Sequence, residues 1–437
     1  MKVSVISPEI YTYGAMLIGG ILRDGGHEVT IANNFAGDTE DPVMLSLYST
    51  QHLLSSEIKQ FVRNKRAEGG TVVIGGPVSA YPEMVIGELE PDFVVIGEGE
   101  ETVIDLLDSG FSKDIAGIAF KDNSGIVIRE KRGQASVNRG LPLIPADISA
   151  QSIRGASAYI ETHRGCTGAC TFCQVPRFFG RNIRSRKLED VLAEVREFKR
   201  MGATRLSISG GTGSLYMADD GKFNEDAFVG LLKEMAAIMG PRNISSPDIR
   251  VDCISERVLD AIRDYSIGWV FFGIESGSDR ILREMGKGAN IQAASDAVFA
   301  CRDHGLKVAG SFIVGHPKET EEDFELTKDF VTGHSLDDAF VSVAEPIPMT
   351  PLADLVLKTP REDNPVYIPH DGEYRSLKLT EAEARSFDLQ MHADMFKPGL
   401  HVVTDEVFNA YLAGVRKDGE EVRAATELLF RYYGSQY

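Results

Sequence analysis

The sequence predicts an α/β protein with two successive parallel-sheet domains and a helical C-terminal region. Strand-like runs rich in valine and isoleucine, often flanked by glycine, alternate along the chain with segments whose apolar residues recur at helical spacing. The chain has 437 residues, of which 43% are hydrophobic, so it is long enough to bury more than one core.

Residues 1–110 are expected to form a doubly wound, Rossmann-like parallel sheet. Ligands bind such sheets beyond the carboxyl ends of the strands, where the chain here reads SP, SLYST, GGPVSAYPE and GEGEE. The predicted strands are KVSVISP, HEVTIAN, PVMLSLYS, TVVIGGP and PDFVVIG, with helical segments between them.

The rest of the chain divides into three further parts. Residues 111–155 are expected to be a linker with a hairpin turning at DNSG. Residues 156–355 contain six strand-plus-helix units, which favours a partial (β/α)6 barrel over the closed eightfold one. A capping box is expected at Thr320. Residues 356–437 are polar and then helical, as in a C-terminal cap or a substrate-facing region.

Charge and hydropathy limit the partners. The formal net charge is −19, which disfavours a nucleic-acid partner, and the one basic run is RNIRSRK at residues 181–187. That run is also typical of a solvated helix entrance. The sequence contains no signal-peptide pattern and no apolar stretch long enough to span a bilayer, so we expect a cytoplasmic protein without a membrane partner.

Three of the five cysteines, Cys166, Cys170 and Cys173, lie within eight residues, whereas Cys253 and Cys301 are isolated. Cys301 is in helical phase with apolar neighbours and is expected in the core. A structural zinc site needs four ligands, usually from two separated pairs, and no second pair follows. An iron–sulfur cubane held by three cysteines leaves one iron open. The amine and carboxylate of S-adenosylmethionine (SAM) can chelate that iron. The alternatives are a zinc knuckle or buried thiols.

The CxxxCxxC spacing, with an aromatic residue before the last cysteine, resembles that of the radical SAM enzymes. ISGGTG, GIESGS, GSFIVGHPKET and EPIPMTPL resemble further strand-end motifs of that family, in order, within residues 156–352. The resemblance implies a 4Fe-4S cluster on Cys166, Cys170 and Cys173. It also implies SAM contacts from Phe172, Gly210, Gly211, Thr212, Glu275 and Ser311.

Some of these assignments have simpler alternatives. Glycine pairs at strand ends are commonly turns, and Glu275 can be a structural carboxylate held by a salt bridge. Thr212 replaces the acidic residue of the family motif. HPKET replaces a glycine-containing motif and places His316 and Lys318 near the site, with no chemistry assigned to either residue.

The first domain resembles the cobalamin-binding domain found ahead of many radical SAM enzymes, through SLYST, VIGGPVSAYPE and VIGEGEET. The DxHxxG motif that supplies a histidine to cobalt is absent, so base-off binding without histidine is expected, with the loop PEIYTYG over the lower face. The two tyrosines of that loop can equally be ordinary aromatic residues. The implied cobalamin contacts are Tyr11, Tyr13, Ser46, Ser49, Gly75, Gly76, Pro77, Gly97, Glu98, Gly99 and Glu100.

Together the two resemblances identify the chain as similar to the cobalamin-dependent radical SAM C-methyltransferases, closest to the methanogen enzymes that methylate a glutamine α-carbon in methyl-coenzyme M reductase. This implies methylation of an unactivated sp3 carbon, through hydrogen abstraction by a 5′-deoxyadenosyl radical and methyl transfer from methylcobalamin. The implied partners are a protein or peptide substrate and an electron donor such as ferredoxin or flavodoxin.

Three other functions remain open at this point. A radical SAM methylase or cyclase acting on a small molecule shares every motif. A tRNA methylthiotransferase resembles the barrel but needs three more cysteines in its first domain, and no cysteine precedes Cys166. A cobalamin sensor explains the first domain but has no use for a cluster.

Overall fold

The computed structural model describes residues 1–209, 211–219, 222–245, 248–399 and 402–436. Its first sheet has seven strands in the order β2-β1-β3-β4-β5-β6-β7. The first five strands are mutually parallel, as predicted, and the last two add an antiparallel hairpin. The strands are β1 (Lys2–Ile6), β2 (Glu28–Ala32), β3 (Val43–Ser46), β4 (Val72–Gly75), β5 (Phe93–Val95), β6 (Ile118–Asp122) and β7 (Gly125–Ile128).

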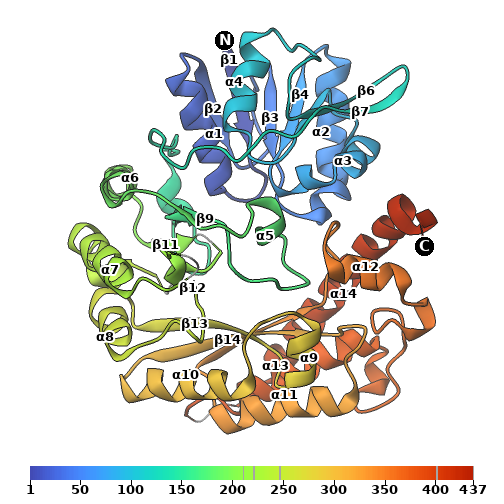
Figure 1. Cartoon of the computed structure of the whole chain (residues 1–437). Coiled ribbons are helices and arrows are strands. Elements are labelled where there is room, and N and C mark those ends of the chain that lie inside the picture. The colour runs from blue at the N-terminus through green and yellow to red at the C-terminus, as the bar shows by residue number, and fades with distance from the viewer. Residues whose placement is uncertain (210, 220–221, 246–247, 400–401, 437) are drawn as a thin grey trace.

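Helices cover both faces of this sheet (Figure 1). Alternate strand residues separate into two buried clusters, one against α1 and α4 and the other against α2 and α3. This is the two-sided burial that produced the continuous valine and isoleucine runs of the sequence. The helices are α1 (Tyr13–Asp24), α2 (Ser56–Ala67), α3 (Pro82–Leu89) and α4 (Glu100–Asp108).

The hairpin β6–β7 belongs to the first sheet, which therefore extends beyond residue 110. Its first strand pairs with β5, and its turn is closed by Asp122, which accepts hydrogen bonds from the backbone and hydroxyl of Ser124. Only the chain after the hairpin acts as the connection to the second domain.

In the part of the second domain that the structure describes, six parallel strands are present, as the predicted partial barrel requires. They pair as β11–β8 and as β12–β13–β14–β15, and a parallel bridge between Leu206 and Ile244 links the two groups in sequence order. The strands are β8 (Ala158–Glu161), β11 (Leu206–Ser209), β12 (Asp248–Ile249), β13 (Trp269–Glu275), β14 (Lys307–Val314) and β15 (Asp338–Val343).

The helices α6, α7, α8, α10 and α11 of this domain pack against the outside of the strands, whereas α5 and α9 lie in loops that follow strands (Figure 1). Cys301 is fully buried among them, and α11 begins with the predicted capping box of Thr320 and Asp323. The helices are α5 (Val175–Phe178), α6 (Leu188–Arg200), α7 (Glu225–Met239), α8 (Glu256–Tyr265), α9 (Asp279–Glu284), α10 (Ile291–Asp303) and α11 (Glu321–His334).

The C-terminal region holds α12 (Pro351–Lys358), α13 (Glu381–Met395) and α14 (Asp405–Tyr433). The last of these reaches the first domain, where the Tyr432 hydroxyl donates to Glu88 at 3.0 Å and Gln51 donates to a backbone carbonyl of α14. The C-terminal region is thus a brace between the two domains. No helix in the described part of the chain is long and apolar enough to cross a membrane.

Candidate functional site

The three clustered cysteines lie in one loop that is closed at its base by a two-stranded antiparallel ribbon. The ribbon pairs β9 (His163–Arg164) with β10 (Arg184–Ser185), and the loop between them carries the cysteines and then α5. The backbone N–H of Thr171 donates to the carbonyl of Met285, and the N–H of Leu352 donates to the carbonyl of Thr171. The loop is therefore held by segments that follow β13 and β15.

Two thiols of the cysteine loop lie around the position of a glycine. A Cβ built on Gly168 would lie 3.4 Å from the Cys166 sulfur and 3.8 Å from the Cys170 sulfur, so the two sulfurs flank a space kept free by glycine. In the described residues no three cysteine, histidine or acidic side chains converge as one zinc ion would need. A cubane binds each cysteine through a different iron, so its sulfurs need not converge.

Burial raises the pKa of the Cys170 thiol, and it raises the pKa of Cys173 to about 11. Cationic side chains oppose this effect: Lys287 and Arg250 act on Cys170, and Arg177 acts on Cys173. Metal binding must displace the thiol protons, and the nearby cations then stabilise the anionic cluster.

Beside Cys170 lies a second polar group, made of Glu275, Ser311 and Lys287. The Lys287 ammonium lies 2.6 Å from Glu275 Oε1, and the Ser311 hydroxyl donates to Oε2 at 3.3 Å. Glu275 is buried and has a φ of 70°, in the left-handed region that a non-glycine residue adopts at a cost of about 1–3 kcal/mol. The structure thus brings two of the predicted SAM residues together, but the carboxylate is already in a salt bridge.

The remaining predicted SAM residues occupy different surroundings. Gly211 is exposed with a φ of 85°, and a Cβ there would lie 3.8 Å from Cys166 Cβ, so its backbone adjoins the cysteine loop; Thr212 follows it and is half-buried. Gly210 lies outside the described residues. The Phe172 ring packs in an apolar cluster with residues of the C-terminal region such as Leu352.

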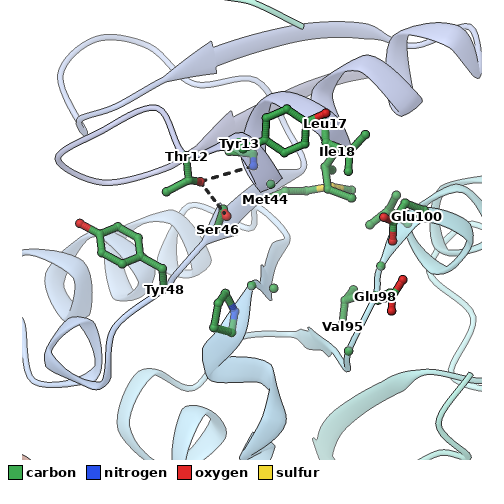
Figure 2. Close-up of a pocket in the computed structure, with 18 of the residues that line it drawn as sticks. Thr12, Tyr13, Leu17, Ile18, Met44, Ser46, Tyr48, Val95, Glu98 and Glu100 are labelled. Atoms are coloured by element: carbon green, nitrogen blue, oxygen red, sulfur yellow. Dashed lines mark hydrogen bonds between the residues drawn. The ribbon is translucent and has the colours of Figure 1, made fainter. Parts of the chain in front are cut away.

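At the carboxyl edge of the first sheet lies a cavity of about 300 Å³ (Figure 2). Its apolar wall is formed by Leu17 and Ile18 of α1 and by Met44 and Val95 of the strands. The hydroxyl oxygens of Thr12 and Ser46 lie 3.4 Å apart. The cavity also reaches Arg164, Phe178 and Phe179 around the cysteine loop, together with Glu161 and Ser209 at strand ends of the barrel.

Most of the predicted cobalamin contacts line this cavity. A Cβ on Gly75 would meet nothing nearer than 4.0 Å, so bare backbone faces open space there, as a bulky planar ligand requires. The predicted residues in the lining are Tyr13, Ser46, Gly75, Gly76, Pro77, Gly97, Glu98, Gly99 and Glu100.

Two predicted contacts are absent from the lining, which corrects their expected position. Tyr11 is buried against the barrel core, and its hydroxyl donates to Asp147 at 3.1 Å. The Ser49 side chain caps the short helix that follows it, by accepting from the backbone of Gln51. The Tyr11 hydroxyl and the Ser49 hydroxyl thus have hydrogen-bond partners outside the cavity lining.

Two arginines of the site, Arg164 and Arg184, were not among the residues predicted from the sequence. Glu98 and Glu100 form ion pairs with Arg164, and Glu98 also pairs with Arg184. The basic run 181–187 is thus partly buried rather than a solvated helix entrance: Arg186 is only 1% exposed. Its arginine-rich composition, next to the cysteines, was the one available signal.

His316 and Lys318 are now placed as well. His316 is buried, and its Nδ1 accepts from the backbone of Lys318 at 3.2 Å. The Lys318 ammonium lies 2.7 Å from Glu284, in the helix whose end contacts the cysteine loop. Both residues therefore support the loops around the site.

Comparison with known proteins is consistent with this geometry. Residues 160–331 match the model of the radical SAM superfamily. A Methanocaldococcus jannaschii protein, provisionally named a methylthiotransferase, is 50% identical over 438 residues, covering 99% of this chain and 96% of its own length. The chain belongs to the radical SAM superfamily. A 4Fe-4S cluster and SAM are typical of its members.

Two further proteins resemble this radical SAM enzyme. An uncharacterized methyltransferase of Pyrococcus horikoshii is 33% identical over 298 residues, which cover 64% of this chain and 62% of that protein. The structure of TsrM from Kitasatospora setae, a radical SAM methyltransferase solved with cobalamin and a 4Fe-4S cluster bound, superposes with a TM-score of 0.71. It is 17% identical and covers 98% of this chain and 99% of its own, so the whole architecture is shared.

Proposed function

We propose that this radical SAM enzyme is a cobalamin-dependent methyltransferase that adds a methyl group to an unactivated sp3 carbon. The observation that carries the proposal is the cavity at the carboxyl edge of the first sheet. Its lining combines the glycine-rich strand ends of the first domain with Arg164, Phe178 and Phe179 around the cysteine loop. A cofactor bound there would be shared between the two domains.

When bound, the cluster with SAM would supply hydrogen-atom abstraction, and methylcobalamin would supply the methyl group. Cys166, Cys170 and Cys173 would hold three irons. Lys287 and Ser311, beside Cys170, offer a cation and a hydroxyl to the polar ends of SAM once they exchange partners with Glu275.

The first domain would bind cobalamin mainly by shape. Leu17, Met44 and Val95 offer apolar contact and exclude water, while the Thr12 and Ser46 hydroxyls can bond the polar tail. Among the residues described, no histidine lines the cavity, so a cobalt bound there would have no histidine ligand from the lining.

For the substrate, the sequence resemblance favours a protein, with a glutamine α-carbon of methyl-coenzyme M reductase as the target and ferredoxin or flavodoxin as the electron donor. A small-molecule methylase or cyclase is the alternative. Methylthiotransfer is favoured by the name of the Methanocaldococcus relative and by similarity to bacterial tRNA-2-methylthio-N(6)-dimethylallyladenosine synthases. Against it, the sequence has no cysteine before Cys166 that could ligate a second cluster in the first domain.

The test is anaerobic incubation of the reconstituted chain with SAM, reductant, methylcobalamin and a glutamine peptide of methyl-coenzyme M reductase. We expect 5′-deoxyadenosine and a peptide that gains one methyl group. A peptide deuterated at the glutamine α-carbon should pass deuterium to 5′-deoxyadenosine. Gain of a methylthio group, or 5′-deoxyadenosine without any methylated product from peptides or small molecules, would contradict the proposal.

A further inference from the structure

A buried ion network joins the first domain to the base of the cysteine loop. Three arginines and three glutamates take part, and none of the six side chains is more than 18% exposed. They are Arg139, Arg164, Arg184, Glu98, Glu100 and Glu161. The two glutamates of the first domain flank Gly99, where the loop after β5 leads into α4, and both line the cavity.

Arg164 is the centre of this network. Its Nη1 lies 2.7 Å from Glu98 and 2.5 Å from Glu100 in the first domain, while its Nε lies 3.0 Å from Glu161 in the barrel. It stands two residues before Cys166. One guanidinium therefore connects the cavity loop with the chain that delivers the first cysteine.

Glu98 is held from both strands of the ribbon that closes the cysteine loop. Arg164 lies on β9 and Arg184 lies opposite it on β10, and both pair with the Glu98 carboxylate. The backbone N–H of Ala135 donates to the same carboxylate at 3.1 Å. Any shift of the cavity loop relative to the base of the cysteine loop would break several of these contacts together.

Stability alone does not account for so many buried charges. Replacing a buried ion network by packed apolar residues is often neutral or stabilising, because the charges lose their hydration. Such a network restricts how the two segments can be oriented, because carboxylates and guanidinium groups form paired hydrogen bonds in only a few relative orientations. At this interface the directional contact fixes one loop of the cavity against the loop of the cysteines.

We propose that Arg164 is a positioning residue that keeps the cobalamin cavity in register with the cluster loop, so that hydrogen abstraction stays coupled to methyl transfer. This inference rests on the proposed function. The arginine acts through Glu98 and Glu100, and its removal loosens the register without removing a cluster ligand.

The experiment compares Arg164→Met and Glu98→Gln with wild type. The matched control is Arg132→Met, since the ion pairs of Arg132 are to Glu101 and Asp105 on α4, within the first domain. Three quantities are measured: the EPR signal of the reduced cluster, methylated product per 5′-deoxyadenosine, and hydrogen exchange of residues 95–100 and 162–166 in the cofactor-free chain.

For Arg164→Met we expect an unchanged cluster signal, continued 5′-deoxyadenosine formation, faster exchange in both segments, and about tenfold less product per 5′-deoxyadenosine, since small misplacements of reacting groups cost large factors in rate. Glu98→Gln should change the same quantities about threefold, because Glu100 and Glu161 still hold Arg164. Arg132→Met should match wild type in the product ratio.

Two results would overturn the inference. One is a product ratio in both variants equal to that of wild type. The other is loss of the cluster signal in both, which would make the network a support for the cysteine ligands alone. If Arg164→Met fails to fold, the product ratio of Glu98→Gln tests the inference, since that variant keeps the arginine. If wild type itself makes no methylated product, the proposed function fails, while exchange in the cofactor-free chain still tests the connection.

Discussion

The carboxyl edges of the two parallel sheets carry opposite kinds of surface. At the first sheet, glycines and apolar side chains such as Met44 and Val95 surround a cavity, and the glutamates at its rim are neutralised by arginines. At the barrel, thiols lie among cations, with Lys287 and Arg250 near Cys170.

The difference shows how one fold principle can serve two ligands. Both edges gather loops from several strands, as parallel sheets do. The first edge offers room by leaving side chains out, which fits a large and mostly neutral cofactor. The second brings thiols together with a lysine and an arginine that are themselves paired with carboxylates, which fits a polar, sulfur-bound cluster. Perturbing either edge should therefore impair one cofactor and spare the other.

The largest effect should come from the cluster ligands. Cys170→Ala should abolish the iron–sulfur absorbance and 5′-deoxyadenosine formation, because a cubane cannot be held by two cysteines. Cobalamin binding should persist, as judged by its visible spectrum. Cys301→Ala is the control: that thiol is fully buried in the core, so its loss should lower stability but leave the iron content unchanged.

Filling the apolar edge should give the reverse result. Gly75→Leu extends a side chain into the cavity and should weaken cobalamin binding about 100-fold, close to 2.7 kcal/mol. Equilibrium dialysis measures the affinity, and iron content should equal that of wild type. Gly414→Leu, at an exposed position with no atom within 4 Å of an added Cβ, should bind cobalamin normally. If Gly75→Leu and Gly414→Leu bind cobalamin with equal affinity, cobalamin does not bind in this cavity.

A smaller effect, on SAM binding, is expected at the salt bridge beside Cys170. Lys287→Met removes the cation that pairs with Glu275, and we expect about tenfold weaker SAM binding with the cluster still assembled. Lys328→Met removes a comparably half-buried lysine that pairs with Asp388, and should leave the SAM affinity unchanged. An undiminished SAM affinity in Lys287→Met would show that this lysine serves only Glu275.

The smallest effect on the reaction should come from His316, whose role is in stability. Burial lowers the pKa of His316 to about 4, so between pH 4 and about 6.5 the unfolded chain binds the extra proton. The neutral, buried His316 therefore contributes to the free energy of unfolding at pH 7. This contribution is lost as the pH falls, and at pH 5 the free energy of unfolding should be lower by about 2 kcal/mol. Denaturant unfolding of the cofactor-free chain at both pH values measures it. His316→Gln should reduce the difference.

Much of this protein was readable from its sequence, because the relevant signals are local. Buried parallel strands need continuous apolar runs, so the strands of both sheets could be read in order. The spacing of Cys166, Cys170 and Cys173 lies within one loop, and the capping box at Thr320 lies within one turn. Gly75 marked a strand end where backbone meets open space, and Gly76 a turn packed against the backbone of Leu47.

The tertiary structure alone decided which distant side chains meet. The hairpin β6–β7 joined the first sheet because the free edge of β5 was there to pair with it. Tyr11 and Tyr13 lie two residues apart, but only Tyr13 lines the cavity, since the start of α1 turns the two rings in different directions. Arg164 found Glu98 across 66 residues of chain. Charge complementarity between domains leaves no periodic trace in sequence, so this contact could be seen only in the folded molecule.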